Sequence, residues 1–149
     1  YTFLGCESLK EVTLPSNPNL TELYEGIFHK CHALEKVTLP DNITSIRFLT
    51  KNGGTDMYPF YECYNLKHIS LPKNMTEING SIFYACYGLE SITLGKKIQS
   101  IMGNAFSWCY NLKEITLPVS LKEIDVNCWL KLSFIVVNIL FSVNMFLFT

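Results

Sequence analysis

The sequence is organised by a repeat of 23 residues, which is clearest in the segment Ser81–Pro118. Two successive copies share the pattern Phe-x-x-Cys-x-x-Leu-x-x-Ile-Thr-Leu, the first beginning at Phe83 and the second at Phe106. A fixed period of about 20–29 residues is typical of a solenoid in which every copy forms one coil. The chain is therefore predicted to fold as a stack of coils, in which each apolar motif position becomes a column.

Three earlier copies of the pattern begin at Phe3, Phe28 and Phe60. The array is therefore predicted to contain about five coils within residues 1–124. Extra residues separate the first three copies, in a turn at Ser16–Asn19 and in a longer insertion at Arg47–Pro59. Such insertions emerge as loops on one face of a solenoid. Because Tyr1 already lies inside a copy, we expect the array to be truncated at its N-terminus and the chain to be a fragment.

Each coil is expected to contain a short strand at Leu-x-x-Ile-x-Leu, where alternate side chains point inward. Proline or glycine then turns the chain, and a second extended segment follows at an Ile-x-x-Ile pattern. The Phe-x-x-Cys unit is expected to form a short helical turn, because a spacing of three places both side chains on one helix face. The predicted fold class is thus an α/β repeat solenoid with parallel β-sheets and short helical turns.

Five of the six cysteines occupy one motif position. They are Cys6, Cys31, Cys63, Cys86 and Cys109. Neighbours in a stack lie about 4.8 Å apart, which is close enough for a disulfide, but their parallel Cβ vectors do not converge as a disulfide requires. Since a free cysteine behaves as a small buried hydrophobe, the column predicts a ladder of thiols along the core.

Composition and motifs argue against several functions. A formal net charge of −1 gives no electrostatic support for binding to nucleic acid. No phosphate-binding loop or Ser/His/Asp arrangement is recognisable. His29 and His32 flank Cys31, but an inward Cys31 would leave only two metal ligands. The chain is therefore predicted not to be an enzyme, and no metal or cofactor is predicted.

Aromatic side chains flank the Phe-x-x-Cys units and form the candidate ligand-binding set. The set comprises Tyr61, Tyr64, Tyr84, Tyr87, Trp108 and Tyr110. On a helical turn, residues three apart share a face, and stacked coils would align them in a stripe. Tyrosine and tryptophan are enriched in binding hot spots. The alternative is that these rings cover the edge of the core between coils, with their hydroxyls in water.

Four Asn-x-Ser/Thr sequences are possible glycosylation acceptors if the protein passes through a glycosylating secretory pathway. They begin at Asn19, Asn42, Asn74 and Asn79. The first three occupy the same turn of successive coils, because threonine follows the apolar residue there.

The last part of the chain, residues 125–149, departs from the repeat. Continuing the period places Trp129 at the Phe position, Leu132 at the Cys position and Asn138 at the Ile position. Residues 132–149 carry no charge, and 18 residues is near the lower limit for a membrane-spanning helix. Three interpretations stay open: an apolar membrane anchor, a degenerate last coil that caps the core, and a wrongly translated segment.

The pattern from Ile78 to Pro118 resembles the BspA-like, or Treponema pallidum-type, leucine-rich repeats, and the resemblance covers residues 1–124. Gly95, at a position where other copies carry proline, is one departure. The resemblance implies a right-handed solenoid with a curved parallel sheet, in a surface or secreted protein of bacteria or parasitic protists. It also implies adhesion to host cells, to matrix proteins such as fibronectin, or to other microbes, and no catalytic residues.

Two functional hypotheses follow. The first is a non-enzymatic protein-binding and adhesion module on a cell surface or in a secreted protein, with a host matrix or cell-surface protein as ligand. The second is an intracellular scaffold, in the cytoplasm, whose apolar tail is only a capping coil.

Overall fold

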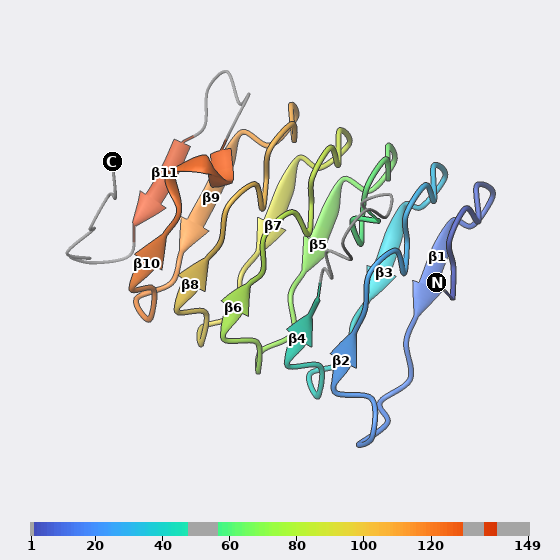
Figure 1. Ribbon diagram of the computed structural model, residues 1–149, viewed down its shortest axis with the longest axis horizontal. Coiled ribbons are helices and arrows are strands. Elements are labelled where there is room, and N and C mark those ends of the chain that lie inside the picture. Colours follow the sequence, from blue (N-terminus) through green and yellow to red (C-terminus); the bar gives the residue numbers. More distant parts are fainter. Residues whose placement is uncertain (1, 48–56, 130–135, 140–149) are drawn as a thin grey trace.

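Successive coils of the chain stack side by side along the long axis of the molecule (Figure 1). The computed structural model describes residues 2–47, 57–129 and 136–139. Each of five coils contributes one longer strand to the upper row of Figure 1 and one two-residue strand to the lower row, and a sixth longer strand follows them. The longer strands are β1 (Glu11–Thr13), β3 (Lys36–Thr38), β5 (His68–Ser70), β7 (Ser91–Thr93), β9 (Glu114–Leu117) and β11 (Val136–Ile139). The shorter strands are β2 (Glu22–Leu23), β4 (Ser45–Ile46), β6 (Glu77–Ile78), β8 (Ser100–Ile101) and β10 (Glu123–Ile124).

The strands form where the motif alternates inward and outward residues. In β1, β3 and β5 the middle residue is buried and its two neighbours are exposed. Pairing is parallel and joins equal motif positions, so that Val12 lies opposite Val37 and Ile69 lies opposite Ile92. The predicted parallel-strand solenoid of about five coils is thereby confirmed.

The backbone ladders between coils are interrupted at particular places. The upper row divides into the pairs β1–β3, β5–β7 and β9–β11. The lower row divides into β2–β4 and the three-stranded sheet β6–β8–β10. Both rows are interrupted between the second and third coils, on either side of the insertion at Arg47–Pro59. Between the fourth and fifth coils only the upper row is interrupted. Strands β7 and β9 belong to separate sheets, whereas β8 and β10 are paired.

A column of phenylalanine rings runs through the core. Phe28, Phe60, Phe83 and Phe106 are fully buried, and Phe3 packs against them from the first coil. Successive rings in the column lie 5.4, 5.2, 5.1 and 5.6 Å apart between centroids. Their planes differ by 4–27°, and the centroid distances lie within the range at which aromatic pairs attract beyond simple burial.

The expected helical turn at Phe-x-x-Cys is wrong. The residue before each cysteine adopts a left-handed conformation, which ends a right-handed turn at once. Their φ angles are 66° at Gly5, 60° at Lys30, 56° at Glu62, 54° at Ala85 and 68° at Trp108. Helices also pack about 8–10 Å apart, whereas the phenylalanine rings fix neighbouring coils at 5.1–5.6 Å. Among the described residues the only helix is a 3₁₀ turn at Val126–Trp129.

Three of the five left-handed residues donate a backbone hydrogen bond to the next coil. Gly5 N donates to His29 O at 2.8 Å, Lys30 N to Tyr61 O at 2.8 Å and Ala85 N to Ser107 O at 2.9 Å. Left-handed backbone is costly for non-glycine residues and persists only where the surroundings fix it. Here the inter-coil hydrogen bonds provide that compensation.

The thiol ladder is confirmed. All six cysteines are free, and all except the half-buried Cys6 are buried. Three thiols donate to the carbonyl of a phenylalanine in the preceding coil, namely Cys31 to Phe3 (3.0 Å), Cys63 to Phe28 (3.2 Å) and Cys109 to Phe83 (3.0 Å). Burial raises the pKa of Cys31 to about 11 and that of Cys86 to about 12. The column therefore combines small apolar volume with one donor per coil.

Strand β11 lies beyond the five predicted coils. It pairs in parallel with β9, and Val137, not the predicted Asn138, lies opposite Ile115. This coil is thus one residue shorter than the period requires. Of the apolar segment 132–149, the structure describes only residues 136–139. No helix within the described ranges is both long and apolar enough to cross a bilayer.

Thiol reactivity tests the ladder. We expect Ellman's reagent at about pH 8 to modify only Cys6 rapidly in the native protein, because the thiolate is the reactive form and burial suppresses it elsewhere. In guanidinium all six cysteines should react. Fewer than six reactive thiols in denaturant, without added reductant, would reveal disulfides and contradict the ladder.

Candidate functional site

Two aromatic columns lie beside the phenylalanine and cysteine ladders. The first column follows the motif phenylalanine and contains His29, Tyr61 and Tyr84. The second column follows the motif cysteine and contains His32, Tyr64, Tyr87 and Tyr110. Tyr58 contacts two rings of the first column, and Trp108 contacts one ring of each column. We call the two columns together with Tyr58 and Trp108 the aromatic face.

The second column is the more regular of the two. Ring centroids are 4.9 Å apart for His32–Tyr64, 5.7 Å for Tyr64–Tyr87 and 5.6 Å for Tyr87–Tyr110, and their planes lie within 14° of parallel. Tyr64 is 41% exposed and Tyr110 is 54% exposed. Because the ring faces cover one another, this column presents mainly ring edges and hydroxyl groups to solvent.

The first column is joined to the second at its C-terminal end. His29 and Tyr61 stack at 4.9 Å, and Tyr61 and Tyr84 follow at 6.2 Å. Trp108 lies 6.5 Å from Tyr84 and 5.9 Å from Tyr110, so its indole connects the two columns.

All six predicted aromatic residues thus lie on one face, although the predicted geometry differs. Tyr61 with Tyr64, and Tyr84 with Tyr87, were expected to pair within a helical turn. The structure places the two members of each pair in separate columns, with ring contacts running from coil to coil. Sequence reasoning missed His29 and His32, although both occupy the same motif positions as the tyrosines.

Glu62 introduces a carboxylate between the two columns. Its Oε2 lies 3.5 Å from Nε2 of His32, in ion-pair range but without hydrogen-bond geometry. Burial, followed by hydrogen bonding to Glu62 and the carboxylate charge, raises the pKa of Tyr61 to about 12. Burial and the Glu62 charge also raise the pKa of Tyr64. These phenols therefore remain neutral donors at any physiological pH.

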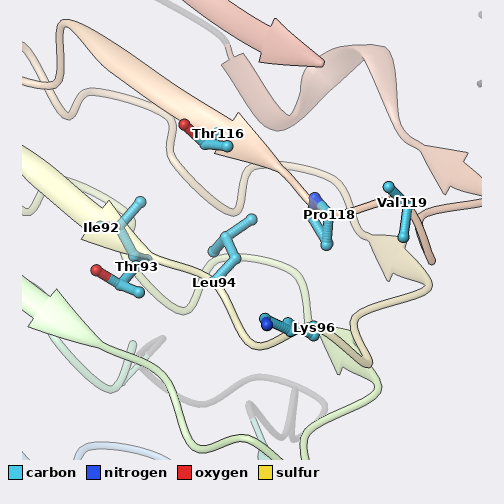
Figure 2. Close-up of a pocket in the computed structure, with 7 residues that line it drawn as sticks. All are labelled: Ile92, Thr93, Leu94, Lys96, Thr116, Pro118 and Val119. Carbon is cyan, nitrogen blue, oxygen red and sulfur yellow. The ribbon is translucent and has the colours of Figure 1, made fainter. Parts of the chain in front are cut away.

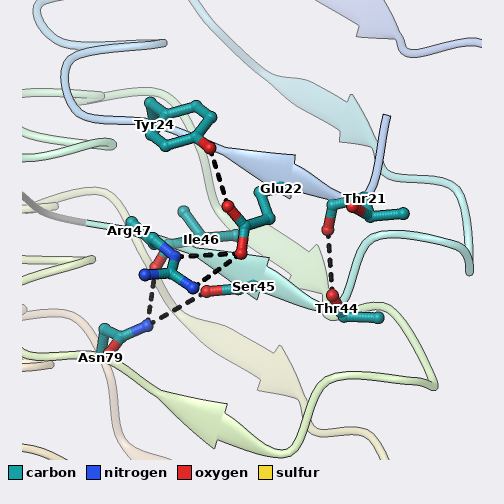
Figure 3. Close-up of polar contacts among 8 residues, drawn as sticks. All are labelled: Thr21, Glu22, Tyr24, Thr44, Ser45, Ile46, Arg47 and Asn79. Carbon is teal, nitrogen blue, oxygen red and sulfur yellow. Dashed lines mark hydrogen bonds and ion pairs between the residues drawn. The ribbon is translucent and has the colours of Figure 1, made fainter. Parts of the chain in front are cut away.

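A polar network joins three coils at the start of the insertion (Figure 3). Arg47 donates from Nε and Nη2 to Oε1 of Glu22, at 3.1 and 2.7 Å, and the Tyr24 hydroxyl donates to Oε2 of Glu22 at 2.7 Å. Across the interrupted lower row, Asn79 Nδ2 donates to Ile46 O at 3.1 Å. Side chains here replace the missing backbone ladder between β4 and β6.

The amides of the predicted glycosylation sites differ in their structural roles. Asn42 Nδ2 donates to Asn17 O at 2.8 Å and to Leu20 O at 2.6 Å. Asn74 Nδ2 donates to Asp41 O at 2.8 Å. Asn19 is exposed, and within the described residues its side chain has no hydrogen bond. Three of the four amides, those of Asn42, Asn74 and Asn79, therefore fasten one coil to the preceding one.

No constellation for chemical catalysis is evident on the aromatic face. Within the described part of the chain, no group of three histidine, cysteine or acidic residues could hold a metal ion. The arrangement offers hydroxyl donors, ring edges and one carboxylate, which suits recognition of another molecule.

The parallel strands, the short coils and the repeated core columns define a leucine-rich-repeat β-solenoid. A family model described as BspA type leucine rich repeat region matches residues 1–50 and 55–146, in six copies. The chain belongs to this family. Leucine-rich-repeat proteins are generally scaffolds for protein interaction and have no catalytic activity of their own.

Solved structures of similar proteins share the fold. A leucine-rich-repeat protein of T. pallidum is 30% identical with a TM-score of 0.68, over 79% of this chain and 52% of that one. A leucine rich cell surface protein of Faecalibacterium prausnitzii A2-165 is 26% identical with a TM-score of 0.67, over 85% and 31%. A leucine-rich repeat protein from Bacteroides ovatus ATCC 8483 is 24% identical with a TM-score of 0.61, over 95% of this chain and 40% of that one. The chain thus spans about half or less of each protein. No curated protein matches the sequence significantly.

The role of Asn42 can be tested by stability measurements. Asn42→Ala should lower the free energy of unfolding by about 1–3 kcal/mol, because two backbone carbonyls lose their donor. Asn19→Ala, at an exposed position in the same turn of the previous coil, should change it by less than about 0.5 kcal/mol. Urea denaturation followed by circular dichroism compares the two, and equal effects would show that the Asn42 amide does not fasten the coils.

Proposed function

We propose that this chain is a protein-binding and adhesion module of a cell-surface or secreted protein, and that it recognises protein ligands through its aromatic face. The observation that carries the proposal is the continuous pair of aromatic columns with exposed Tyr64 and Tyr110. Rigid aromatic side chains supply large contact area at low entropic cost and are enriched in binding hot spots.

The backbone at Trp108 supports this proposal. Trp108 has a φ of 68°, which is unusual for a bulky side chain, and the same motif position is Gly5 in the first coil and Ala85 in the fourth. Each of the five coils has a left-handed residue at this position, so the feature particular to the fifth coil is the bulky side chain. The turn places the indole between Tyr84 and Tyr110, where it widens the aromatic surface.

The stacked arrangement favours a protein ligand. Because neighbouring rings cover one another's faces, the columns offer hydroxyl donors, ring edges and the Glu62 carboxylate. Such a mixed surface resembles the polar, tyrosine-rich contact areas of binding proteins. A host matrix or cell-surface protein is the proposed class of ligand, in keeping with the family resemblance.

The division of the chain is also a proposal. We place the repeat array in residues 1–124 and a degenerate last coil in residues 125–149, because β11 continues the parallel stacking on β9. The family match to residue 146 supports a coil in preference to a membrane anchor. If the protein is secreted through a glycosylating pathway, we propose Asn19 as the preferred acceptor, because its amide is exposed and makes no inter-coil bond.

Surface location is supported by the F. prausnitzii protein, which is described as a cell surface protein. The second candidate function is an intracellular scaffold. It is favoured by the pairing of β11 with β9, because a last coil that caps the core would not anchor the chain in a membrane.

Substitutions on the aromatic face test the binding role. Tyr64→Ser combined with Tyr110→Ser should weaken binding to immobilised fibronectin or other matrix proteins at least tenfold in biolayer interferometry, because exposed hot-spot rings are lost. Tyr24→Ser is the matched control, since Tyr24 is 51% exposed but lies outside the aromatic face. Failure of the unchanged protein to bind any matrix protein, or equal losses in both variants, would refute the proposal.

Membrane extraction tests the last coil. After expression in cells, alkaline carbonate should release the full chain into the supernatant, because a strand paired with β9 does not span a bilayer. A shortened chain that ends at residue 139 should fractionate identically. Retention of only the full chain in the membrane pellet would instead identify the tail as an anchor.

A further inference from the structure

A groove runs along the corner where the longer strands end and the chain turns toward the shorter strands. It consists of two adjoining cavities of about 510 and about 560 Å³, which share Thr93, Leu94 and Lys96. Figure 2 shows the residues that line the first of them. We call it the corner groove and define it by Leu71, Leu94, Pro118 and Val119 in its walls and by Lys73, Lys96 and Lys97 at its rim. Each cavity has the size of a typical ligand pocket.

The first cavity of the corner groove lies where the fourth and fifth coils meet, and the second extends over the second, third and fourth coils. Strands β7 and β9 are not paired, whereas β8 and β10 are, so backbone pairing between the fourth and fifth coils is interrupted on this side alone. Leu94 is half-buried, as is Leu14 in the first coil, whereas Leu71 and Leu117 at the same motif position are 5% and 1% exposed. Val119 is 67% exposed and lies across the opening from Leu94 (Figure 2). Leu94 and Val119 therefore give the groove accessible apolar surface.

The rim of the corner groove is positively charged, although the chain as a whole carries a formal charge of −1. Three lysines and a single acidic residue, Asp41, line it. Lys73 Nζ donates to Asp41 Oδ2 at 2.8 Å, and Lys97 Nζ donates to the amide oxygen of Asn74 at 2.8 Å. Within the described residues Lys96 has neither an ion pair nor a hydrogen bond, and it lines both cavities. Two of the three lysine charges are thus uncompensated.

We propose that the corner groove binds an acidic peptide segment of a partner protein, with an aliphatic side chain seated between Leu94, Pro118 and Val119. The carboxylates of that segment would face Lys96 and Lys97, which gives the charge complementarity that steers and orients protein partners. A sulfated polysaccharide would satisfy the lysines but would leave the apolar walls unfilled, so a peptide fits both features. Hydroxyls of Thr93 and Thr116 at the strand ends supply further polar contacts.

This surface is separate from the aromatic face, which precedes the longer strands, whereas the corner groove follows them. The proposal therefore does not rest on ligand recognition by the aromatic columns. Variants of the two surfaces distinguish the failure of one proposal from the failure of the other.

The experiment uses the full chain and a fluorescein-labelled peptide with one leucine flanked by aspartates, followed by anisotropy. The leucine peptide should bind at least fivefold more tightly than the same peptide with serine in place of leucine. Lys96→Gln combined with Lys97→Gln should weaken binding at least tenfold, and Val119→Ser at least threefold. All three positions are exposed, so folding should be unaffected, which circular dichroism checks.

Two controls make the test specific. Lys113→Gln removes the same charge from an exposed position at the other end of β9 and should leave peptide affinity unchanged, as should Tyr64→Ser on the aromatic face. Absence of binding, equal affinity for the leucine and serine peptides, or insensitivity to the lysine variants would overturn the proposal. Heparin that binds more tightly than the leucine peptide, with no dependence on Val119, would also overturn it and identify a polyanion site.

Discussion

The stacking of phenylalanine rings sets the distance between coils, and the rest of the structure conforms to it. Fully buried rings at 5.1–5.6 Å leave room for one extended or tightly turned segment per coil, but not for a helix. The same spacing brings each cysteine thiol within reach of a phenylalanine carbonyl in the preceding coil, as for Cys109 and Phe83. It also aligns the outer rings, so the aromatic face is a consequence of the core column.

The insertion between the second and third coils shows how robust this constraint is. Phe28 and Phe60 flank it in the column, yet their rings are 5.2 Å apart, as close as in uninterrupted coils. Lengthening a loop costs little additional entropy, so the core tolerates the extra residues. The insertion does affect the backbone hydrogen bonding between coils, because strand pairing is interrupted in both rows at this point. Asn79 reaches across the lower row to Ile46 O and restores one connection with its side chain.

The columns could be predicted from the sequence because the motif occurs five times, so that each structural position can be compared in five coils. Core residues, strand positions and the free thiols followed directly from that repetition. The turn conformation did not, because a three-residue spacing of Phe and Cys fits both a helical turn and a tight turn with one left-handed residue. Lys30, Glu62 and Ala85 carry no signal for that conformation, and only Gly5 hints at it. His29 and His32 were not predicted to belong to the aromatic columns, because the candidate set was chosen by residue type (tyrosine and tryptophan) and not by motif position.

The corner groove could not be predicted at all, because it depends on where the ladder between coils opens. Leu94 occupies an ordinary core position by sequence, yet the structure leaves it half-buried beside the unpaired strands β7 and β9. In a solenoid, a surface built from one repeated residue type is nearly identical on every coil. A partner could therefore bind such a surface at several equivalent positions along the array. Trp108 on the aromatic face and Leu94 with Lys96 in the corner groove interrupt that repetition. Both departures fall in the fourth and fifth coils, which makes this part of the array the place where a partner could be held in a defined position.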